Sequence, residues 1–476
     1  MDQPFLRMVQ ATAFATVLAI SPALLHAQDE PARTLFTNCN VFDGVSDELA
    51  EGRNVLVEDD LISAIGGEDL ADESAELIDC DGRTLMPGLI ESHVHLNMQH
   101  MVGGYDTFEH RDWQEVGAMA AFTAQSILMD GFTTVRDVGA LHAGIRRAVD
   151  SGFAIGPRIY NAGAVISQTS GHGDWRLKGQ NTLDSRYTNK VAQLGLAFVV
   201  DGHDATLSAA RQNLANGASL NKMMMSGGVF SSKDGLHTIQ ATDEEVTAVV
   251  RASNDWGTYA TAHVNNPSDI QRGLRLGLGE IMHGQFLDEE TAKMMVKAGV
   301  FYNPQLSVSS LEAIERTFGP EPSVNKSKSL RVGEGMARIP DILLKFPKLL
   351  EKTTFGVDTV TVTPANAIRN RDHEIWFWAD KFGNLQTLKS MTSIGGQLAA
   401  LTGGQNPYPA GPLGVIEVGA YADILLIDGN PLEDITLIGG SEELFDAPDR
   451  KPGDIPAMHL IMKGGVIFKN TVRSKE

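Results

Sequence analysis

The sequence predicts an α/β protein whose main unit is a (β/α)8 TIM-like barrel. Short apolar runs typical of strands alternate with amphipathic stretches, such as 242–256 and 288–297, in which apolar residues recur at helical spacing. About eight such units in succession favour parallel strands that close into a barrel. The carboxyl ends of these strands meet at one mouth, so residues that are far apart in the sequence come together there.

Two histidines separated by one residue, His93 and His95, end the first apolar run of the barrel region. Because side chains alternate along a strand, both imidazoles project from one face, which suits a divalent metal ion. For an isolated His-x-His pair, two structural histidines near a turn are the more common explanation. Metal binding is favoured here because later apolar runs also end in candidate partners: Lys222, His263, His283 and Asp358.

The composition agrees with an enzyme of this size. The chain has 476 residues, of which 42% are hydrophobic and 21% charged, so it can bury a large core and is not disordered. The formal net charge of −21 argues against a nucleic-acid partner, because nucleic-acid binding needs Lys and Arg gathered on one face.

Several motifs resemble those of the metal-dependent amidohydrolase superfamily, and the likeness runs from about Leu35 to the C-terminus. They stand in the family's order: Gly-Leu-Ile-Glu-Ser-His-Val-His at 88–95, Gly-Phe-Thr-Thr-Val-Arg-Asp-Val-Gly at 131–139, and the stretches 392–399 and 419–432. Glu91 stands where the family usually has Asp, and Val357 replaces the usual Thr before Asp358. Within the family, the stretches 167–174, 200–202 and 222–229 resemble the prolidase-like carboxypeptidases, which include amidohydrolases that cleave ochratoxin.

The resemblance implies two divalent metal ions, one held by His93, His95 and Asp358, the other by His263 and His283, with Lys222 shared. We expect both ions to be zinc. An ammonium group has donors but no acceptor, so the resemblance further implies that CO2 converts Lys222 to N6-carboxylysine, whose carbamate oxygens bridge the metals. Two such metals lower the pKa of a bridging water and hold the substrate carbonyl. Asp358 would take the proton from the bridging water, which leaves a metal-bridging hydroxide, and pass that proton to the leaving nitrogen.

His172 lies in a glycine-flanked turn after the expected third strand, where the backbone can approach a substrate closely. We interpret it as a catalytic residue that stabilises the carbonyl or the transition state; a turn histidine bonded to its own loop is the alternative. A substrate carboxylate needs a cation or hydrogen-bond donors, and the candidates on mouth loops are Arg176, Arg186 and Arg371. For the aromatic run 376–378, helix packing is favoured over a wall of the substrate pocket.

These features predict hydrolysis of an amide or peptide bond that releases a C-terminal amino acid. Dipeptides, N-acyl amino acids and ochratoxin-like aromatic amides are the expected substrates, and the resemblance implies a symmetric homo-oligomer. One alternative is a cyclic-amide hydrolase of the imidazolonepropionase type, which generally uses one metal. Another is a non-catalytic, amidohydrolase-like assembly protein that has lost its metals. The complete ligand set favours the first function, and the metal content per chain separates the three.

The two chain ends are expected to differ from the barrel, which we place at 88–404. Residues 1–27 are typical of a secretory signal peptide, with Arg7 before an apolar stretch too short for a comfortable membrane span; an uncleaved anchor is the alternative. The mature enzyme would then be periplasmic or secreted, with no membrane partner. Short strands flank the barrel region, and the resemblance implies that 28–87 and 405–476 form one discontinuous β-sandwich domain.

Two further features concern covalent and loop structure. Cys39 and Cys80 both fall in expected strands, and neither has a Cys or His at metal-ligand spacing. In an oxidising compartment they can form a disulfide, with free thiols as the equal alternative. The connections 167–218 and 309–349 are longer than a plain barrel needs, so we expect either of them to close over the substrate.

Overall fold

The structure is a computed structural model that describes residues 31–102, 105–177, 190–307, 310–318 and 320–472. The predicted signal peptide, residues 1–27, and the candidate Arg186 lie outside the described residues. Within the described ranges, no helix combines the length and the apolar character that crossing a bilayer would require.

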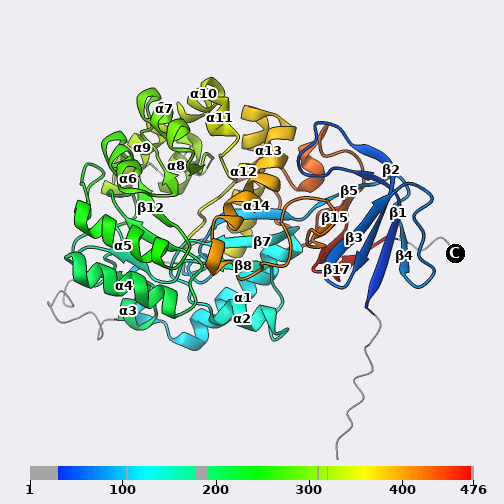
Figure 1. Cartoon of the computed structure of the whole chain (residues 1–476). Coiled ribbons are helices and arrows are strands. Elements are labelled where there is room, and N and C mark those ends of the chain that lie inside the picture. Colours follow the sequence, from blue (N-terminus) through cyan, green and yellow to red (C-terminus); the bar gives the residue numbers. More distant parts are fainter. Residues whose placement is uncertain (1–30, 103–104, 178–189, 308–309, 319, 473–476) are drawn as a thin grey trace, which may run out of the picture.

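Both ends of the chain contribute to one eight-stranded sheet, seen as the blue and red strands beside the helical body in Figure 1. Its central pairing is antiparallel, between β5 from the N-terminal part and β15 from the C-terminal part. The strand order is β17-β16-β15-β5-β1-β2-β3, and β4 pairs with β1. The strands are β1 (Arg33–Val41), β2 (Ala50–Glu58), β3 (Leu61–Gly66), β4 (Glu76–Asp79), β5 (Thr84–Pro87), β15 (Ile424–Ile427), β16 (Met458–Lys463) and β17 (Val466–Asn470).

This sheet curves around a core of its own. Apolar side chains from strands near both ends of the strand order, including Ile62 of β3 and Leu460 of β16, belong to one buried cluster with Phe36 and Leu426. The sheet folds over on itself, because Ile62 N of the edge strand β3 donates to Ala420 O, just before β15, at 2.8 Å. The described strands nevertheless form a single hydrogen-bonded sheet, so the two-sheet sandwich stays a prediction.

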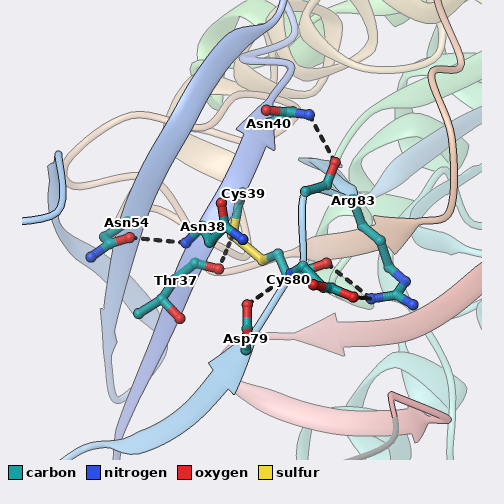
Figure 2. Close-up of a disulfide and its surroundings, with 10 residues drawn as sticks. Thr37, Asn38, Cys39, Asn40, Asn54, Asp79, Cys80 and Arg83 are labelled. Carbon is teal, nitrogen blue, oxygen red and sulfur yellow. Dashed lines mark hydrogen bonds and ion pairs between the residues drawn. A yellow bond between two sulfur atoms is a disulfide. The ribbon is translucent and has the colours of Figure 1, made fainter. Parts of the chain in front are cut away.

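A disulfide joins Cys39 of β1 to Cys80, which follows β4 (Figure 2). Both cysteines are fully buried. Hydrogen bonds hold the same two segments together, because Cys80 N donates to Thr37 O at 2.8 Å and Asn40 Nδ2 donates to Gly82 O at 2.8 Å. The pairing of the two cysteines, one of the alternatives left open by the sequence, is therefore present.

The rest of the chain supplies two parallel sheets whose strands are buried along almost their whole length. β6-β7-β8 form a three-stranded sheet, and β10-β9-β11-β12-β13-β14 form a six-stranded one. Burial on both faces explains why these strands read as continuous apolar runs rather than as alternating ones. The strands are β6 (Leu89–Val94), β7 (Phe132–Asp137), β8 (Arg158–Asn161), β9 (Val165–Ser167), β10 (Ala197–Val199), β11 (Asn221–Met224), β12 (Ala260–Val264), β13 (Glu280–His283) and β14 (Phe301–Asn303).

Helices alternate with these strands and cover them on the outside (Figure 1). The expected helix at 242–256 is α5 (Asp243–Asp255), whose capping box pairs Thr242 with Glu245. The expected helix at 288–297 is α7 (Glu289–Ala298), capped by the Asp288 side chain. The other covering helices are α1 (Trp113–Met129), α2 (Gly144–Asp150), α3 (Lys190–Gln193), α4 (His203–Ala215), α6 (Pro267–Leu276), α12 (Pro364–Phe382), α13 (Asn384–Ser390) and α14 (Ser393–Ala400), with short 3-10 turns at Tyr105–His110, Gly403–Gln405 and Ile435–Ile438.

The long connection after β14 forms a group of four helices. They are α8 (Leu311–Phe318), α9 (Val324–Met336), α10 (Ile339–Lys345) and α11 (Pro347–Leu350). The chain then returns to the strands through residues 353–358, which carry a single parallel bridge from Thr353 to Tyr302. The sequence suggested that this connection lies at the mouth, and α8 and α9 contribute residues to the lining of the central cavity.

The disulfide gives a prediction about stability. Reduction should lower the free energy of unfolding by at most about 4 kcal/mol, because the bond joins residues 41 apart and restricts the unfolded chain. Thermal unfolding with and without a reductant measures this. The double variant Cys39→Ala/Cys80→Ala separates loss of the bond from reduction elsewhere, since the chain has no other cysteine. If the reductant shifts the melting of this variant as much as that of the wild type, the bond is not the cause.

Candidate metal centre and active site

The ends of the parallel strands bring the predicted site residues to one cavity of about 190 Å³. His283 ends β13, His263 lies one residue before the end of β12, and Lys222 lies in β11. His93 lies in β6, and Asp358 follows the segment that returns beside β6 and β14. The cavity is lined by His95, Lys222, His263, His283, Asp358 and His172 among others. His93 lies behind this lining, fully buried, and contacts two of these residues.

Asp358 is the centre of the cluster. Its Oδ1 lies 3.4 Å from His93 Nε2 and 3.3 Å from His95 Nε2, and its Oδ2 lies 3.9 Å from His283 Nδ1. The ligand atoms of His93, His283 and Asp358 all lie within 4.8 Å of one another, which is a spacing suited to one metal ion. Lys222 Nζ points into the same group, 3.5 Å from His93 Nε2.

The remaining imidazoles extend this cluster in a row. The ring of His263 lies 4.2 Å from that of His283, measured between centroids, and it stacks on His172 at 4.3 Å. The Nε2 atom of His283 is buried and has no hydrogen-bond partner. A buried imidazole nitrogen without a partner normally costs stability, so it fits a place reserved for a cation or substrate.

Neighbouring groups fix which nitrogen of the first two histidines faces the centre. The Nδ1 atom of His95 lies 3.0 Å from Gly139 O, and a carbonyl can only accept, so this nitrogen carries the proton. His93 Nδ1 lies 2.9 Å from Asn303 Oδ1, an acceptor, and 3.1 Å from Gln305 Nε2, a donor, so these two amides hold the ring without selecting one tautomer. The Nε2 lone pair of His95 therefore faces Asp358, in the arrangement that supporting groups usually impose on metal-binding histidines.

The backbone around the centre is held in an uncommon conformation. His283 and Asp358 have φ angles of 65° and 56°, in the left-handed region that non-glycine residues rarely occupy. Glu91 Oε1 accepts hydrogen bonds from the backbone N–H groups of His93 and Val357, at 3.1 and 3.0 Å. One buried carboxyl thus fixes the distance between the strand that bears His93 and the segment that bears Asp358.

Burial determines the protonation of these groups. It holds the pKa of His93 and of His263 well below the usual range, lowers that of His283 to about 3, and lowers that of Lys222 to about 8. Burial alone would raise the pKa of Asp358, but His93 and His95 outweigh it and the net shift is downward. Neutral imidazoles beside an ionised carboxylate are the donor set that divalent cations such as zinc prefer, so the residues fit the implied metals.

His172 is joined to a partner that the sequence did not single out. Its Nδ1 lies 3.2 Å from Asp234 Oδ2, and that oxygen also accepts from Gly228 N at 2.9 Å and from Gln240 Nε2 at 3.2 Å. The hydrogen bond to Asp234 places the proton on Nδ1, and the ring lines the cavity. His172 therefore has a fixed orientation with its ring on the cavity, rather than only a bond to its own loop.

The cavity wall beyond the polar floor is mainly apolar. The turn after β11 contributes Val229 and Phe230, and α8 and α9 contribute Ile314, Phe318 and Val332. The rings of Phe230 and Phe318 stack with centroids 6.3 Å apart. Helices α8 and α9 thus form one side of the cavity, as the length of their connection suggested.

Three further candidates for substrate contact, Arg176, Arg371 and the aromatic run 376–378, do not line this cavity. Arg176 bonds Asp174 at 2.7 Å, and Arg371 is buried and paired with Asp130. Among the described residues that line the cavity there is no arginine. In the run 376–378, Trp378 is fully buried and packs against Phe355, so helix packing is confirmed for this residue.

Sequence reasoning missed the residues that support the site. Asp234 stands in the polar stretch Ser-Ser-Lys-Asp-Gly, which looks like an ordinary surface turn. Glu91 was noticed only as a departure from the family's Asp. Asn303 follows a short apolar run, and its position at the end of β14 was the one signal that could have suggested a role.

Comparison with known proteins agrees with this geometry. The profile described as "Amidohydrolase family" matches residues 84–446. Ochratoxinase from Aspergillus niger is 25% identical over 94% of this chain and 89% of its own length. Two solved structures, an amidohydrolase and a prolidase complexed with N-methylphosphonate-L-proline, are each 28% identical, with TM-scores of 0.81 and 0.79. They cover 93% and 92% of this chain and 100% of their own chains, and they give the chain a TIM-barrel-like α/β fold.

The low pKa of His283 leads to a prediction for the metal-free protein. An unfolded histidine takes up a proton near pH 6.5, whereas the folded His283 does so only near pH 3. Between these values the unfolded state binds more protons, so the free energy of unfolding must fall as the pH falls, by at most about 1.4 kcal/mol per pH unit for this residue. Urea unfolding of chelator-treated protein at a series of pH values measures the slope.

His283→Asn should make that slope shallower, and His203→Asn, at the exposed start of α4, is the control. An unchanged slope in His283→Asn would show that this imidazole is not held neutral by burial.

Proposed function

Because the chain belongs to the amidohydrolase family, we propose that it is a metal-dependent enzyme that hydrolyses an amide or peptide bond of a small molecule and releases a C-terminal amino acid. The observation that carries this proposal is the meeting of His95, His263, His283, Lys222 and Asp358 at one cavity, with the imidazole of His93 directly behind them. Amide hydrolysis needs an activated water, a polarised carbonyl and an acid for the departing amine, and these groups supply places for all three.

Two features support the substrate class. The similar proteins include an ochratoxinase and a prolidase, whose names describe hydrolysis of amide or peptide bonds. The apolar wall formed by Phe230, Phe318 and Val332 suits an aromatic or bulky aliphatic group next to the scissile bond. We therefore propose dipeptides, N-acyl amino acids and ochratoxin-like amides as the substrates to test.

The proposed metal ligands are His93, His95 and Asp358 for one ion, His263 and His283 for the other, and Lys222 for both. When bound, two divalent ions lower the pKa of a water and polarise the substrate carbonyl. Burial lowers the pKa of Lys222 to about 8, which raises the neutral fraction of its amine. Only a neutral amine has the lone pair that adds to CO2, so this burial supports our proposal that Lys222 is carboxylated.

Other steps belong to residues of the chain itself. Asp358 is ionised and lies within 3.4 Å of two imidazoles, so its carboxylate can accept a proton from the attacking water and deliver it to the leaving nitrogen. In its doubly protonated form, His172 would keep its Nδ1–H on Asp234 and donate a hydrogen bond from Nε2–H to the carbonyl oxygen as negative charge develops there.

We also propose that the two parallel sheets close into one (β/α)8 barrel. Residues 353–358 support this, because Thr354 N donates to Tyr302 O of β14 at 2.9 Å while Ser92 N of β6 donates to Phe355 O at 3.0 Å. On the other side, β8 and β9 are separated only by residues 162–164 and would form one interrupted third strand. The buried disulfide supports a periplasmic or secreted location, since such bonds persist in oxidising compartments.

The proposed function is tested with purified protein loaded with zinc. We expect about two metal ions per chain and hydrolysis of dipeptides or N-acyl amino acids that differ at the C-terminal residue. Lys222→Ala should lose most activity and much of the metal, and short carboxylic acids such as formate should restore part of both by replacing the carbamate. One metal per chain with activity on cyclic amides only, or no metal and no activity, would contradict the proposal.

Asp358→Asn tests the proton transfer. The variant should lower kcat by roughly 10²- to 10⁴-fold, the usual contribution of a general acid–base, while retaining more metal than Lys222→Ala. Steady-state kinetics with metal analysis of the same sample measures both effects. Asp234→Asn is a useful comparison, because it weakens the support of His172 without replacing a proposed ligand. A normal rate in Asp358→Asn would exclude the shuttle.

A further inference from the structure

The ammonium group of Lys328 is held by backbone carbonyl groups rather than by a carboxylate. Lys328 lies in α9, and its Nζ donates to the carbonyl oxygens of Gly228, Ser231 and Asp234, at 3.1, 2.8 and 2.6 Å. An ammonium group has three donors, so all of them are used on one short turn. We call residues 228–234 the catalytic turn.

The catalytic turn holds His172 in two ways. Asp234 accepts from the Nδ1 of His172, and the same carboxylate oxygen accepts from Gly228 N, which closes the turn. Gly228 also presses against the imidazole ring, because a Cβ atom built there would lie 2.2 Å from His172 Cε1. The orientation of His172 therefore depends on the shape of this turn.

Helices α8 and α9 rest on the catalytic turn from the other side. Phe230 of the turn stacks on Phe318 of α8, but Phe230 is 47% exposed, so this contact is only partly buried. The three hydrogen bonds of Lys328 form a second connection, and because their donor is charged each is about twice as strong as a neutral hydrogen bond. Ser329 and Val332, which follow Lys328 in α9, line the cavity.

We propose that Lys328 is a positioning residue, which shapes the catalytic turn so that Asp234 and His172 face the substrate carbonyl. Lys328 neither contacts His172 nor lines the cavity. It acts by donating to three carbonyl groups at once, which fixes these groups relative to one another. This inference rests on the proposed function for its kinetic consequence, whereas its structural consequence is independent of any activity.

The kinetic test is a double-mutant cycle between Lys328 and Asp234. Lys328→Met keeps the length and the apolar part of the side chain, and we expect kcat to fall by roughly 10- to 100-fold with little change in KM, because His172 acts when charge develops on the carbonyl. In the Lys328→Met/Asp234→Asn double variant the two losses should not multiply, because both act through His172. Lys328→Arg should restore part of the rate.

Lys345→Met is the matched control, since this lysine lies in α10 of the same helical group and pairs only with Glu289 on the exposed side, at 2.6 Å. Hydrogen exchange followed by mass spectrometry supplies the readout without activity: the segment 226–240 should exchange faster in Lys328→Met than in Lys345→Met. If exchange in this segment is unchanged, the proposal fails. It also fails if the two kinetic losses multiply. If the wild-type enzyme hydrolyses no amide, the proposed function fails, and the exchange result still decides the role of Lys328.

Discussion

The structure depends on holding one ionised carboxylate among buried imidazoles. Asp358 has three histidines within 3.9 Å and Lys222 close behind, and its side chain is 26% exposed on the cavity. Holding this charge among buried groups is costly, because burial lowers the pKa of two of the three imidazoles, His93 and His283, and so keeps them neutral. The surrounding groups keep this cluster at a spacing suited to a metal ion.

Those groups act on the backbone as much as on side chains. Glu91 ties β6 to the segment before Asp358, and the left-handed φ of Asp358 turns its carboxylate toward the histidines. Gly356 allows the close approach, because a Cβ atom there would lie 2.7 Å from His93 Cβ. Strain at a few residues persists only where the packing around them determines their positions, as the buried parallel strands do here.

The sequence predicted the polar residues that meet at the cavity better than the ones that support them. Strand periodicity placed His93 and His95 on one face, and the ends of apolar runs indicated Lys222, His263 and His283, which the structure brings together. Periodicity says which face a residue occupies but not which partner it meets across the fold. Arg176 and Arg371 were therefore expected on mouth loops, although each forms an ion pair with an aspartate. The partner of His172, Asp234, was overlooked.

The position of the catalytic turn links substrate selection to reactivity. The turn supplies Phe230 to the apolar wall and Asp234 to the support of His172, within five residues of backbone. A bulkier or smaller wall residue that displaced the turn would also displace the imidazole, and a displacement near 1 Å can cost about 100-fold in rate. We therefore expect changes of specificity to be tolerated best at wall residues that neither belong to the turn nor lie next to Lys328 in α9, such as Ile314 of α8.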